Sequence, residues 1–438
     1  AVAALAREVG FTQVSASHEV SPLIKFVGRG DTTVVDAYLS PILRRYVEQV
    51  AAELGGVRLL FMQSSGGLTD ARLFQGKDSI LSGPAGGIVG AARVAELAGL
   101  DRIIGFDMGG TSTDVTHYAG EFERTFETQV AGVRMRAPMM QIHTVAAGGG
   151  SICHFDGARY RVGPDSAGAD PGPACYRRGG PLTVTDCNVM LGKLQPEFFP
   201  HVFGPNADQP LDAEVVRRRF AELAEQIRRQ TGDTRTPVEV AQGFLDIAVE
   251  NMANAIKRIS IQRGYDVSRY TLVSFGGAGG QHACLVADAL GMQRVLLHPF
   301  AGVLSAYGMG LADIRALREQ SIELPLADGA LAEAERVAAR LIEDAAAELA
   351  AQEVTEYRTY TRVHLKYQGT DTALIVPLAD EAAVIESFEA AYRQQFGFVM
   401  HGRPLVVDAV SVELDGGGSD ATEEPLAASR QGGLQPLD

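Results

Sequence analysis

The sequence predicts an α/β fold, because apolar strands alternate with helices along the chain. Three glycine-rich turns also follow apolar strands directly, at 66–67 (GG), 109–110 (GG) and 276–280 (GGAGG). Two segments rich in small residues, 82–97 and 301–311, read as helices that can pack very closely. Glycine turns let backbone N–H groups approach an anion, and closely packed helices suit a hinge. The sequence therefore predicts two lobes that clamp a nucleotide.

Composition limits the function classes open to this chain. Of its 438 residues, 46% are hydrophobic and 21% charged, which is ordinary for a globular enzyme of two or three domains. The net charge of −15 argues against a nucleic-acid-binding surface, and no apolar run is long enough to cross a membrane. Four scattered cysteines without a C-x-x-C spacing indicate a reducing compartment, so we expect a cytoplasmic protein. The chain begins with Ala1 inside a predicted helix, so we expect an internal fragment of a longer protein.

The first hundred residues are predicted to be mainly helical. Apolar residues at helical spacing predict a helix over 32–52 with a kink at Pro41. The run VRLLFMQ predicts a buried strand over 57–63. We also expect a helix end at 1–9, a strand at 12–17 and the small-residue helix at 82–97.

The rest of the chain is predicted to mix strands and helices. A region rich in strands runs from 103 to 165, and 163–180 holds too many glycines and prolines for regular structure. The expected helices are 212–231, 237–263, 281–290, 330–352 and 382–396. The expected strands are 122–129, 133–137, 270–275, 294–297, 362–367, 372–377 and 405–414, and the tail from Gly416 is expected to be disordered.

The run IIGFDMGGTSTDV at 103–115 is the most informative motif. It predicts a hairpin whose glycine backbone and hydroxyl groups close around phosphates. Asp107 is the candidate catalytic residue and metal ligand, since Mg²⁺ takes one or two carboxylates besides water and phosphate oxygens. Asp114 is expected to brace the turn or simply to cap it, and the alternative for the whole motif is an ordinary glycine hairpin. The candidate phosphate ligands are Gly109, Gly110, Thr111, Ser112 and Thr113.

Several motifs resemble those of the hydantoinase A / 5-oxoprolinase family of the actin-like ATPase superfamily. They are SGPAGGIVGA, FDMGGTSTDV, HTVAAGGGSI, GPDSAGADPGPACY, SFGGAGGQHA and GVLSAYGM, and the similarity spans residues 14–415. SHEVSPLIKFVGRGDTTVVDAYLSP and YQGTDTALIV are most similar to the 5-oxoprolinase branch. The resemblance implies a two-lobed, actin-like (ribonuclease H-like) α/β core with a C-terminal α+β segment, truncated at its N-terminus.

The resemblance also implies a division into domains. Residues 1–100 are the remainder of the first ATPase lobe and end in a connecting helix at 82–97. Residues 101–312 form the second lobe, with the phosphate hairpin and an adenosine motif. Residues 313–415 form the C-terminal α+β segment, and 416–438 form the disordered tail. The family's N-terminal domain, with a further phosphate motif, is absent, so we expect this fragment alone to be inactive.

The activity implied by the resemblance is ATP-dependent hydrolysis of a cyclic amide, 5-oxoproline or a hydantoin, through phosphorylation of the amide oxygen. It implies ATP and Mg²⁺, with K⁺ from family similarity only, a hydantoinase B-like partner and a role in glutathione metabolism. We also expect a homo-oligomer. The implied nucleoside ligands are Gly276, Gly277 and Gly279. Two alternatives are a subunit of an acetone-type carboxylase and a nucleotide-binding switch without lactam chemistry.

Other polar residues have a catalytic and a structural interpretation. His143 ends a strand beside the glycine run, where it is a candidate acid–base group or a structural histidine. Asp165, Asp170 and Asp186 lie in or beside the glycine-rich and proline-rich loop, where they either hold a ligand or simply cap turns, and Asp165 is the candidate catalytic residue. Cys175 is expected to be a buried thiol rather than a nucleophile. Arg29 and Asp31 are placed in a turn, where they pair across the lobes or bind substrate, or, as we expect, have a structural role.

Overall fold

The computed structural model describes residues 1–130, 132–327 and 329–417. The helices are α1 (Val2–Val9), α2 (Ser17–Val20), α3 (Phe26–Glu53), α4 (Ser82–Leu97), α5 (Val184–Met190), α6 (Ala213–Thr231), α7 (Pro237–Ile259), α8 (Ala283–Leu290), α9 (Leu304–Leu311), α10 (Ala330–Ala351) and α11 (Glu381–Phe396). The strands up to β9 are β1 (Leu60–Met62), β2 (Leu68–Asp70), β3 (Ile103–Met108), β4 (Thr113–Tyr118), β5 (Arg124–Thr125), β6 (Thr128–Val130), β7 (Val133–Met135), β8 (Met139–Met140) and β9 (His143–Val145). The later strands are β10 (Ser151–Phe155), β11 (Tyr160–Ser166), β12 (Thr271–Phe275), β13 (Arg294–Leu297), β14 (Arg315–Pro325), β15 (Arg358–Tyr367), β16 (Leu374–Pro377) and β17 (Leu405–Asp415).

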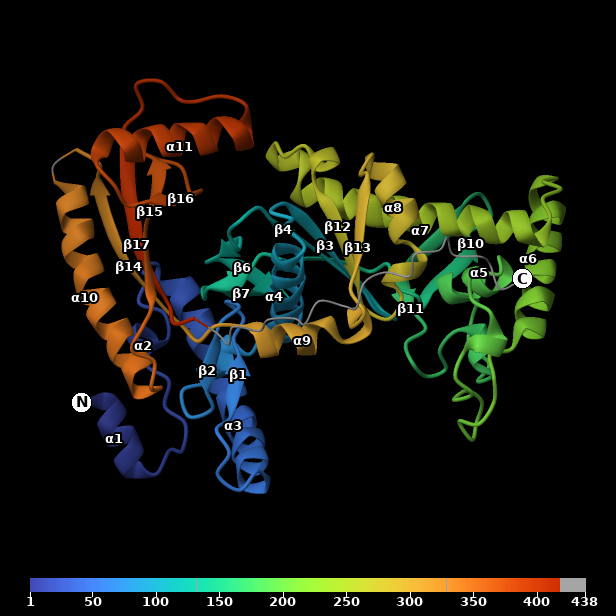
Figure 1. Ribbon diagram of the computed structural model, residues 1–438, viewed down its shortest axis with the longest axis horizontal. Coiled ribbons are helices and arrows are strands. Elements are labelled where there is room, and N and C mark those ends of the chain that lie inside the picture. The colour runs from blue at the N-terminus through green and yellow to red at the C-terminus, as the bar shows by residue number, and fades with distance from the viewer. Residues whose placement is uncertain (131, 328, 418–438) are drawn as a thin grey trace, which may run out of the picture.

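A five-stranded mixed sheet lies at the centre of the molecule, with strand order β13-β12-β3-β4-β9 (Figure 1). Strands β13, β12 and β3 are parallel, β4 runs antiparallel to β3, and β9 runs antiparallel to β4. Strand β9 therefore has the direction of β3. As a result, the chain leaves β3, β9, β12 and β13 at the same edge of the sheet, which is where ligands bind in open α/β folds.

Helices cover both faces of this sheet. Phe106 and Val115 point to the face covered by α7, where they join one large hydrophobic core with Ala248 and Met252. The start of α7 is fixed by a capping box between Thr236 and Glu239 and by a proline at its first helical position. The opposite face is covered by α4, whose small residues form a second core with Phe275 and other strand residues.

Helices α4 and α9 cross almost without side chains between them. A Cβ atom placed on Gly308 of α9 would lie 2.1 Å from the Gly86 carbonyl oxygen and 2.5 Å from the Gly90 nitrogen of α4. Similarly, a Cβ on Gly90 would lie 2.7 Å from the Leu304 carbonyl oxygen. Only glycine allows backbones to approach this closely, so the expected close contact of the two small-residue helices is confirmed.

A second, four-stranded sheet has the order β14-β17-β15-β16, is wholly antiparallel and packs against α10 and α11 (Figure 1). Glu413 on its central strand β17 is buried beneath three arginines. The Arg124 guanidinium donates two hydrogen bonds of 2.7 Å to its carboxylate, while Arg315 and Arg362 approach to 3.1 and 3.4 Å. This Glu413 cluster ties β5 of the chain's middle region to the C-terminal sheet.

The structure corrects several expectations for the first hundred residues. Residues 12–17 form no strand; instead the Ser15 hydroxyl donates to Asp36 of α3 at 2.7 Å, so side chains rather than a strand ladder hold this segment. The predicted strand at 57–63 is reduced to β1, which pairs only with β2. Arg29 and Asp31 lie in the first turns of α3, not in a loop.

Two longer segments also differ from expectation. The helix expected over 237–263 ends at Ile259 and is followed by a separate 3₁₀ turn over Ile261–Arg263. The breaker-rich region begins with regular structure, since β11 extends to Ser166. The expected disordered tail lies, from residue 418 onward, outside the described residues. Among the described helices, none combines the length and apolar character needed to cross a membrane.

Candidate functional site

The hairpin turn after β3 and the glycine turn after β12 lie side by side at the shared edge of the central sheet. Asp107 pairs in register with Phe275, and the Ala278 N–H donates to the Met108 carbonyl at 2.9 Å. A Cβ on Gly276 would lie 2.3 Å from an oxygen of the Asp107 carboxylate, and Gly276 has a φ of +79°. Both facts require glycine at this position. The structure thus brings the predicted phosphate hairpin and the predicted nucleoside turn into direct contact.

The tip of the hairpin presents free backbone donors. The Gly109 N–H donates across the turn to the Ser112 carbonyl at 3.0 Å. No group in the described part of the chain accepts a hydrogen bond from the N–H of Gly110, Thr111 or Ser112. Gly110 and Thr111 are exposed. Successive unpaired N–H groups form a concave site that suits an anion such as a phosphate.

The triple glycine 148–150 packs directly onto this tip. A Cβ on Gly148 would lie 2.5 to 2.7 Å from backbone atoms of Thr111 and Ser112. The Gly149 N–H donates to the Gly109 carbonyl at 3.1 Å, and the Gly150 N–H donates to the Gly110 carbonyl at 2.5 Å. The loop after β9 therefore fixes the shape of the hairpin from behind through backbone contacts alone.

Asp107 and Asp114 form a cross-strand pair on the face of the sheet opposite α7. Burial, and then the charge of Asp114, raise the pKa of Asp107 to about 6. Burial also raises the pKa of Asp114, whose carboxylate accepts a hydrogen bond of 2.6 Å from the Thr144 hydroxyl. In the described residues, no donor contacts the Asp107 carboxylate, and no group of three metal-ligating side chains occurs. This pair fits Mg²⁺ held mainly by water and phosphate, with one or two carboxylates.

Two predicted site residues do not reach this place. Thr113 is fully buried, and its hydroxyl donates to the Ala147 carbonyl at 2.5 Å, so it is not free to bind a phosphate. His143 pairs in register with Val115, so its side chain points to the α7 face, away from Asp107. Burial, together with nearby Arg258 of α7, lowers the pKa of His143.

The breaker-rich loop lies behind the triple glycine. Asp165 is exposed, and its neighbour Ser166 lies next to Gly150, where a Cβ would come within 3.1 Å of the Ser166 hydroxyl. Asp170 is also exposed. Asp186, by contrast, is fully buried and accepts hydrogen bonds from the N–H groups of 174, 175 and 183. Asp186 is therefore a structural cap.

Cys175 is buried as expected. Burial is the main cause that raises the pKa of its thiol well above the usual range, which makes it unreactive at neutral pH.

The nucleoside turn contains an exposed glycine, Gly277, and a buried one, Gly279. Gly277 is exposed, and a Cβ there would meet open space. Gly279 is buried, and a Cβ would lie 2.7 Å from the Ser274 hydroxyl, so its role is close packing under the turn. Two residues of α5 were not predicted: Thr185, which bonds to the Gly149 carbonyl behind the hairpin tip, and Asn188, which bonds to Gln281 and His282 just after the nucleoside turn. The spacing of Thr183 and Asp186, typical of a capping box, could have shown where this helix begins.

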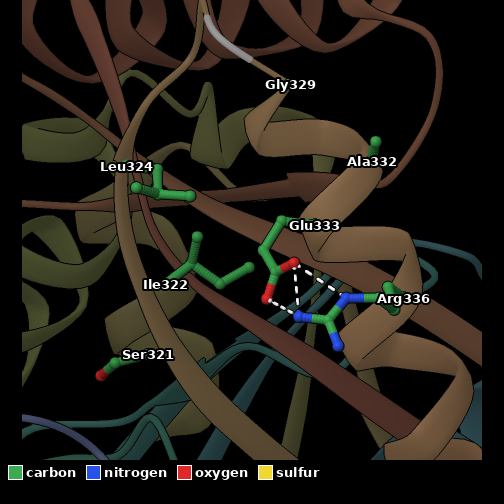
Figure 2. A pocket seen from close by; sticks show the side chains of 7 residues that line it. All are labelled: Ser321, Ile322, Leu324, Gly329, Ala332, Glu333 and Arg336. Carbon is green, nitrogen blue, oxygen red and sulfur yellow. Dashed lines mark hydrogen bonds and ion pairs between the residues drawn. The ribbon is translucent and has the colours of Figure 1, made fainter.

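Two cavities lie elsewhere. One of about 510 Å³ lies between β14 and the start of α10, where Glu333 pairs with Arg336 (Figure 2). The other, of about 810 Å³, is lined by the Glu413 cluster and the C-terminal end of α4. Neither contains a residue that the sequence predicts for the site.

The comparisons with known proteins agree with the motifs. The family model described as hydantoinase/oxoprolinase matches residues 29–318. The chain is 40% identical to a 5-oxoprolinase of Dictyostelium discoideum over 97% of this chain and 36% of that protein. It is 43% identical to a 5-oxoprolinase of Saccharomyces cerevisiae over 94% of this chain and 33% of that protein. The chain thus spans about a third of the length of these two curated relatives.

Two solved structures share the fold. The ATP-dependent caprolactamase of Pseudomonas jessenii superposes with a TM-score of 0.83 and 30% identity, over 94% of this chain and 62% of that chain. The nucleotide-free structure of an acetone carboxylase superposes with a TM-score of 0.65 and 22% identity, over 94% of this chain and 61% of that chain. The second match shows a shared fold only.

Proposed function

Because the chain belongs to the hydantoinase/oxoprolinase family, we propose that it is the nucleotide-binding part of an ATP-dependent hydrolase of cyclic amides, with 5-oxoproline as the substrate. Relatives named 5-oxoprolinase and a neighbour named ATP-dependent caprolactamase support this class of reaction. The observation that carries the proposal is the contact between the hairpin at 107–114 and the turn at 276–280. A triphosphate nucleotide needs both an anion site and a nucleoside site within a few ångströms.

In this proposal the hairpin tip holds the phosphates. The free N–H groups of Gly110, Thr111 and Ser112 donate to phosphate oxygens, and the exposed Thr111 hydroxyl adds a further donor. Gly277 lines the nucleoside on its exposed side. Asp107 and Asp114 would hold hydrated Mg²⁺, which supplies positive charge to the transferring phosphoryl group. Asp107 must lose its proton for this role, and a pKa of about 6 allows it near neutral pH.

The chemistry explains why such an enzyme needs ATP. An amide carbonyl is a poor electrophile, and opening an unstrained lactam is unfavourable. Transfer of the γ-phosphoryl group from ATP to the amide oxygen releases ADP and makes the ring carbon open to attack by a first water. The ring nitrogen then takes up a proton and leaves as the C–N bond breaks, which opens the ring to an acyl phosphate. A second water attacks this acyl phosphate and releases phosphate. The net reaction consumes ATP and two waters and yields ADP, phosphate and glutamate. The protein's task is then positioning and charge neutralisation rather than covalent catalysis.

The proposed architecture is the two-lobed actin-like core, with α4 and α9 as the connecting helices. Residues 1–100 would complete the first lobe, 101–312 would form the second, and 313–415 would form the C-terminal segment. Because the chain spans about a third of its curated relatives, the complete enzyme is proposed to need further segments, including a hydantoinase B-like part. A relative named caprolactamase subunit alpha supports a partner subunit.

Phosphate release by the full-length protein with its B-type part tests the proposal. We expect ATP hydrolysis that 5-oxoproline stimulates, with one glutamate formed per phosphate. Stimulation by a ketone with bicarbonate would instead indicate a carboxylase, and stimulation only by a protein partner would indicate a switch. Absence of ATP binding would refute all three.

A further inference from the structure

We propose that α5 is a brace that holds the hairpin tip and the nucleoside turn in register, with Thr185 and Asn188 as its positioning residues. The inference rests on the proposed function, since it concerns how the same nucleotide site keeps its shape. Neither residue was predicted from the sequence, and neither is placed in contact with the nucleotide. Their effect is transmitted through the two turns that they hold.

Thr185 holds the hairpin tip through the triple glycine. The Gly149 carbonyl accepts two hydrogen bonds from this one residue, from its N–H at 2.8 Å and from its hydroxyl at 2.9 Å. Gly149 in turn donates to the Gly109 carbonyl. A side chain at Gly149 would collide with the Thr185 hydroxyl, since a Cβ there would lie 2.8 Å from it. The position of Thr185 thus sets the position of the turn that carries the free N–H groups.

Asn188 holds the nucleoside turn. Its side-chain amide donates to the Gln281 carboxamide oxygen at 2.7 Å and lies 3.1 Å from Nε2 of His282. These two residues directly follow the turn at 276–280. Asn188 and His282 are both fully buried, and burial lowers the pKa of His282 to about 4. The ring is therefore neutral at pH 7, and a neutral imidazole has one nitrogen that can accept a hydrogen bond.

One short helix carries both contacts. Residues three apart lie on the same side of a helix, so Thr185 and Asn188 point toward the same edge of the sheet. The start of α5 is fixed by the capping box, in which Asp186 accepts hydrogen bonds from the N–H and the hydroxyl of Thr183 at 2.8 and 3.0 Å. The buried Asp186 also accepts the N–H groups of 174 and 175, which ties the helix to the loop before it. A rotation of α5 would break all of these bonds together, so the two turns keep a fixed separation.

The test compares two ligands on the full-length protein. Thr185→Val keeps the shape of the side chain and removes only the hydroxyl. We expect it to weaken MgADP binding roughly threefold to tenfold, the effect of one hydrogen bond, and to leave adenosine binding unchanged. Thr185→Ser restores the hydroxyl and should restore MgADP affinity. Asn188→Ala should weaken adenosine and MgADP alike. The matched control is Thr231→Val on α6, whose hydroxyl also donates to a backbone carbonyl, that of Ile227 at 2.8 Å, and which should leave both affinities unchanged.

Hydrogen exchange at the hydrogen-bonded N–H groups of Gly109, Gly149 and Gly150 gives a second readout that needs no turnover. Faster exchange there in Thr185→Val, with an unchanged melting temperature, supports the brace. Wild-type MgADP affinity and wild-type exchange in a folded Thr185→Val protein would overturn it. If Asn188→Ala does not fold, the comparison of Thr185→Val with Thr185→Ser still tests the proposal. A wild-type protein that binds no MgADP would instead refute the proposed function, so the two failures are distinguishable.

Discussion

Gly308 at the crossing of α4 and α9 offers the sharpest test of the architecture, through the substitution Gly308→Ala. The added Cβ would lie 2.1 Å from the Gly86 oxygen, 2.5 Å from the Gly90 nitrogen and 2.7 Å from the Gly90 Cα. All three atoms belong to backbone, so no rotamer change relieves the overlap. The helices must separate by more than about 1 Å to bring the shortest of these distances to ordinary van der Waals contact. Overpacking costs about 1 to 3 kcal/mol, occasionally more, and we expect the upper end here.

The matched control is Gly310→Ala, two residues further along the same helix, where a Cβ would meet no atom within 4 Å. It should be neutral or stabilising by up to about 1 kcal/mol, because alanine favours helix. Scanning calorimetry should show a melting temperature for Gly308→Ala lower by about 3 °C, at about 1 °C per kcal/mol for a chain of 438 residues. Equal melting temperatures for the two variants would refute the backbone contact between α4 and α9.

Four further predictions concern charged residues. Asp107→Asn should abolish substrate-stimulated phosphate release. Calorimetry at pH 7.5 should show a melting temperature equal to or above that of the wild type, because a disfavoured buried charge is removed. Full activity in this variant would exclude Asp107 from the site. The rate of phosphate release should fall as pH drops through about 6, where Asp107 takes up a proton. Asp114→Asn should shift this fall to lower pH, because the charge of Asp114 raises the pKa of Asp107. An unshifted pH profile would assign the fall to another group. Since the pKa of folded Asp107 lies above its ordinary value of 3.8, the folded state holds the extra proton between pH 4 and 6, and the stability contributed by Asp107 falls as pH rises through that window. Arg124→Leu should lower the free energy of unfolding by about 3 kcal/mol, because the buried Glu413 carboxylate loses the arginine that donates two hydrogen bonds to it. The control Arg161→Leu removes an exposed ion pair with Asp156 and should lower it much less. Similar losses in the two variants would contradict the burial of the cluster.

Local patterns predicted much of the fold. The strand–turn–strand at 103–115, the unit from β12 to β13 and the long helix α7 follow directly from apolar periodicity and glycine position. The family match confirms the resemblance read from the motifs. The strand at 12–17 was predicted wrongly because β-branched and polar residues there suit a strand, while Asp36 far along the chain supplies the competing hydrogen bond.

The site was predicted less completely, for a physical reason. Asp107 and the glycines of the two turns could be proposed from their residue types alone, and the structure brings them together. The placement of His143 on the α7 face depends on register, because a residue shifted by one position would face the opposite side of the sheet. Thr113 was expected to be a ligand because its hydroxyl is polar, yet the Ala147 carbonyl, 34 residues away, accepts its hydrogen bond. Such pairings across the sheet leave no local pattern in the sequence.

The Glu413 cluster limits where the chain can be truncated into separately folding pieces. Arg124 and Glu413 are separated by 289 residues, yet they share two hydrogen bonds. Asp313, which pairs with Arg93 of α4, lies directly after the boundary proposed at 312. A shortened protein ending there would keep both arginines and lose both carboxylates, leaving two cations exposed or buried without counter-charges. Expression of residues 1–312 alone should therefore give poorly soluble material, and any separable piece that holds these arginines must include β14 and β17.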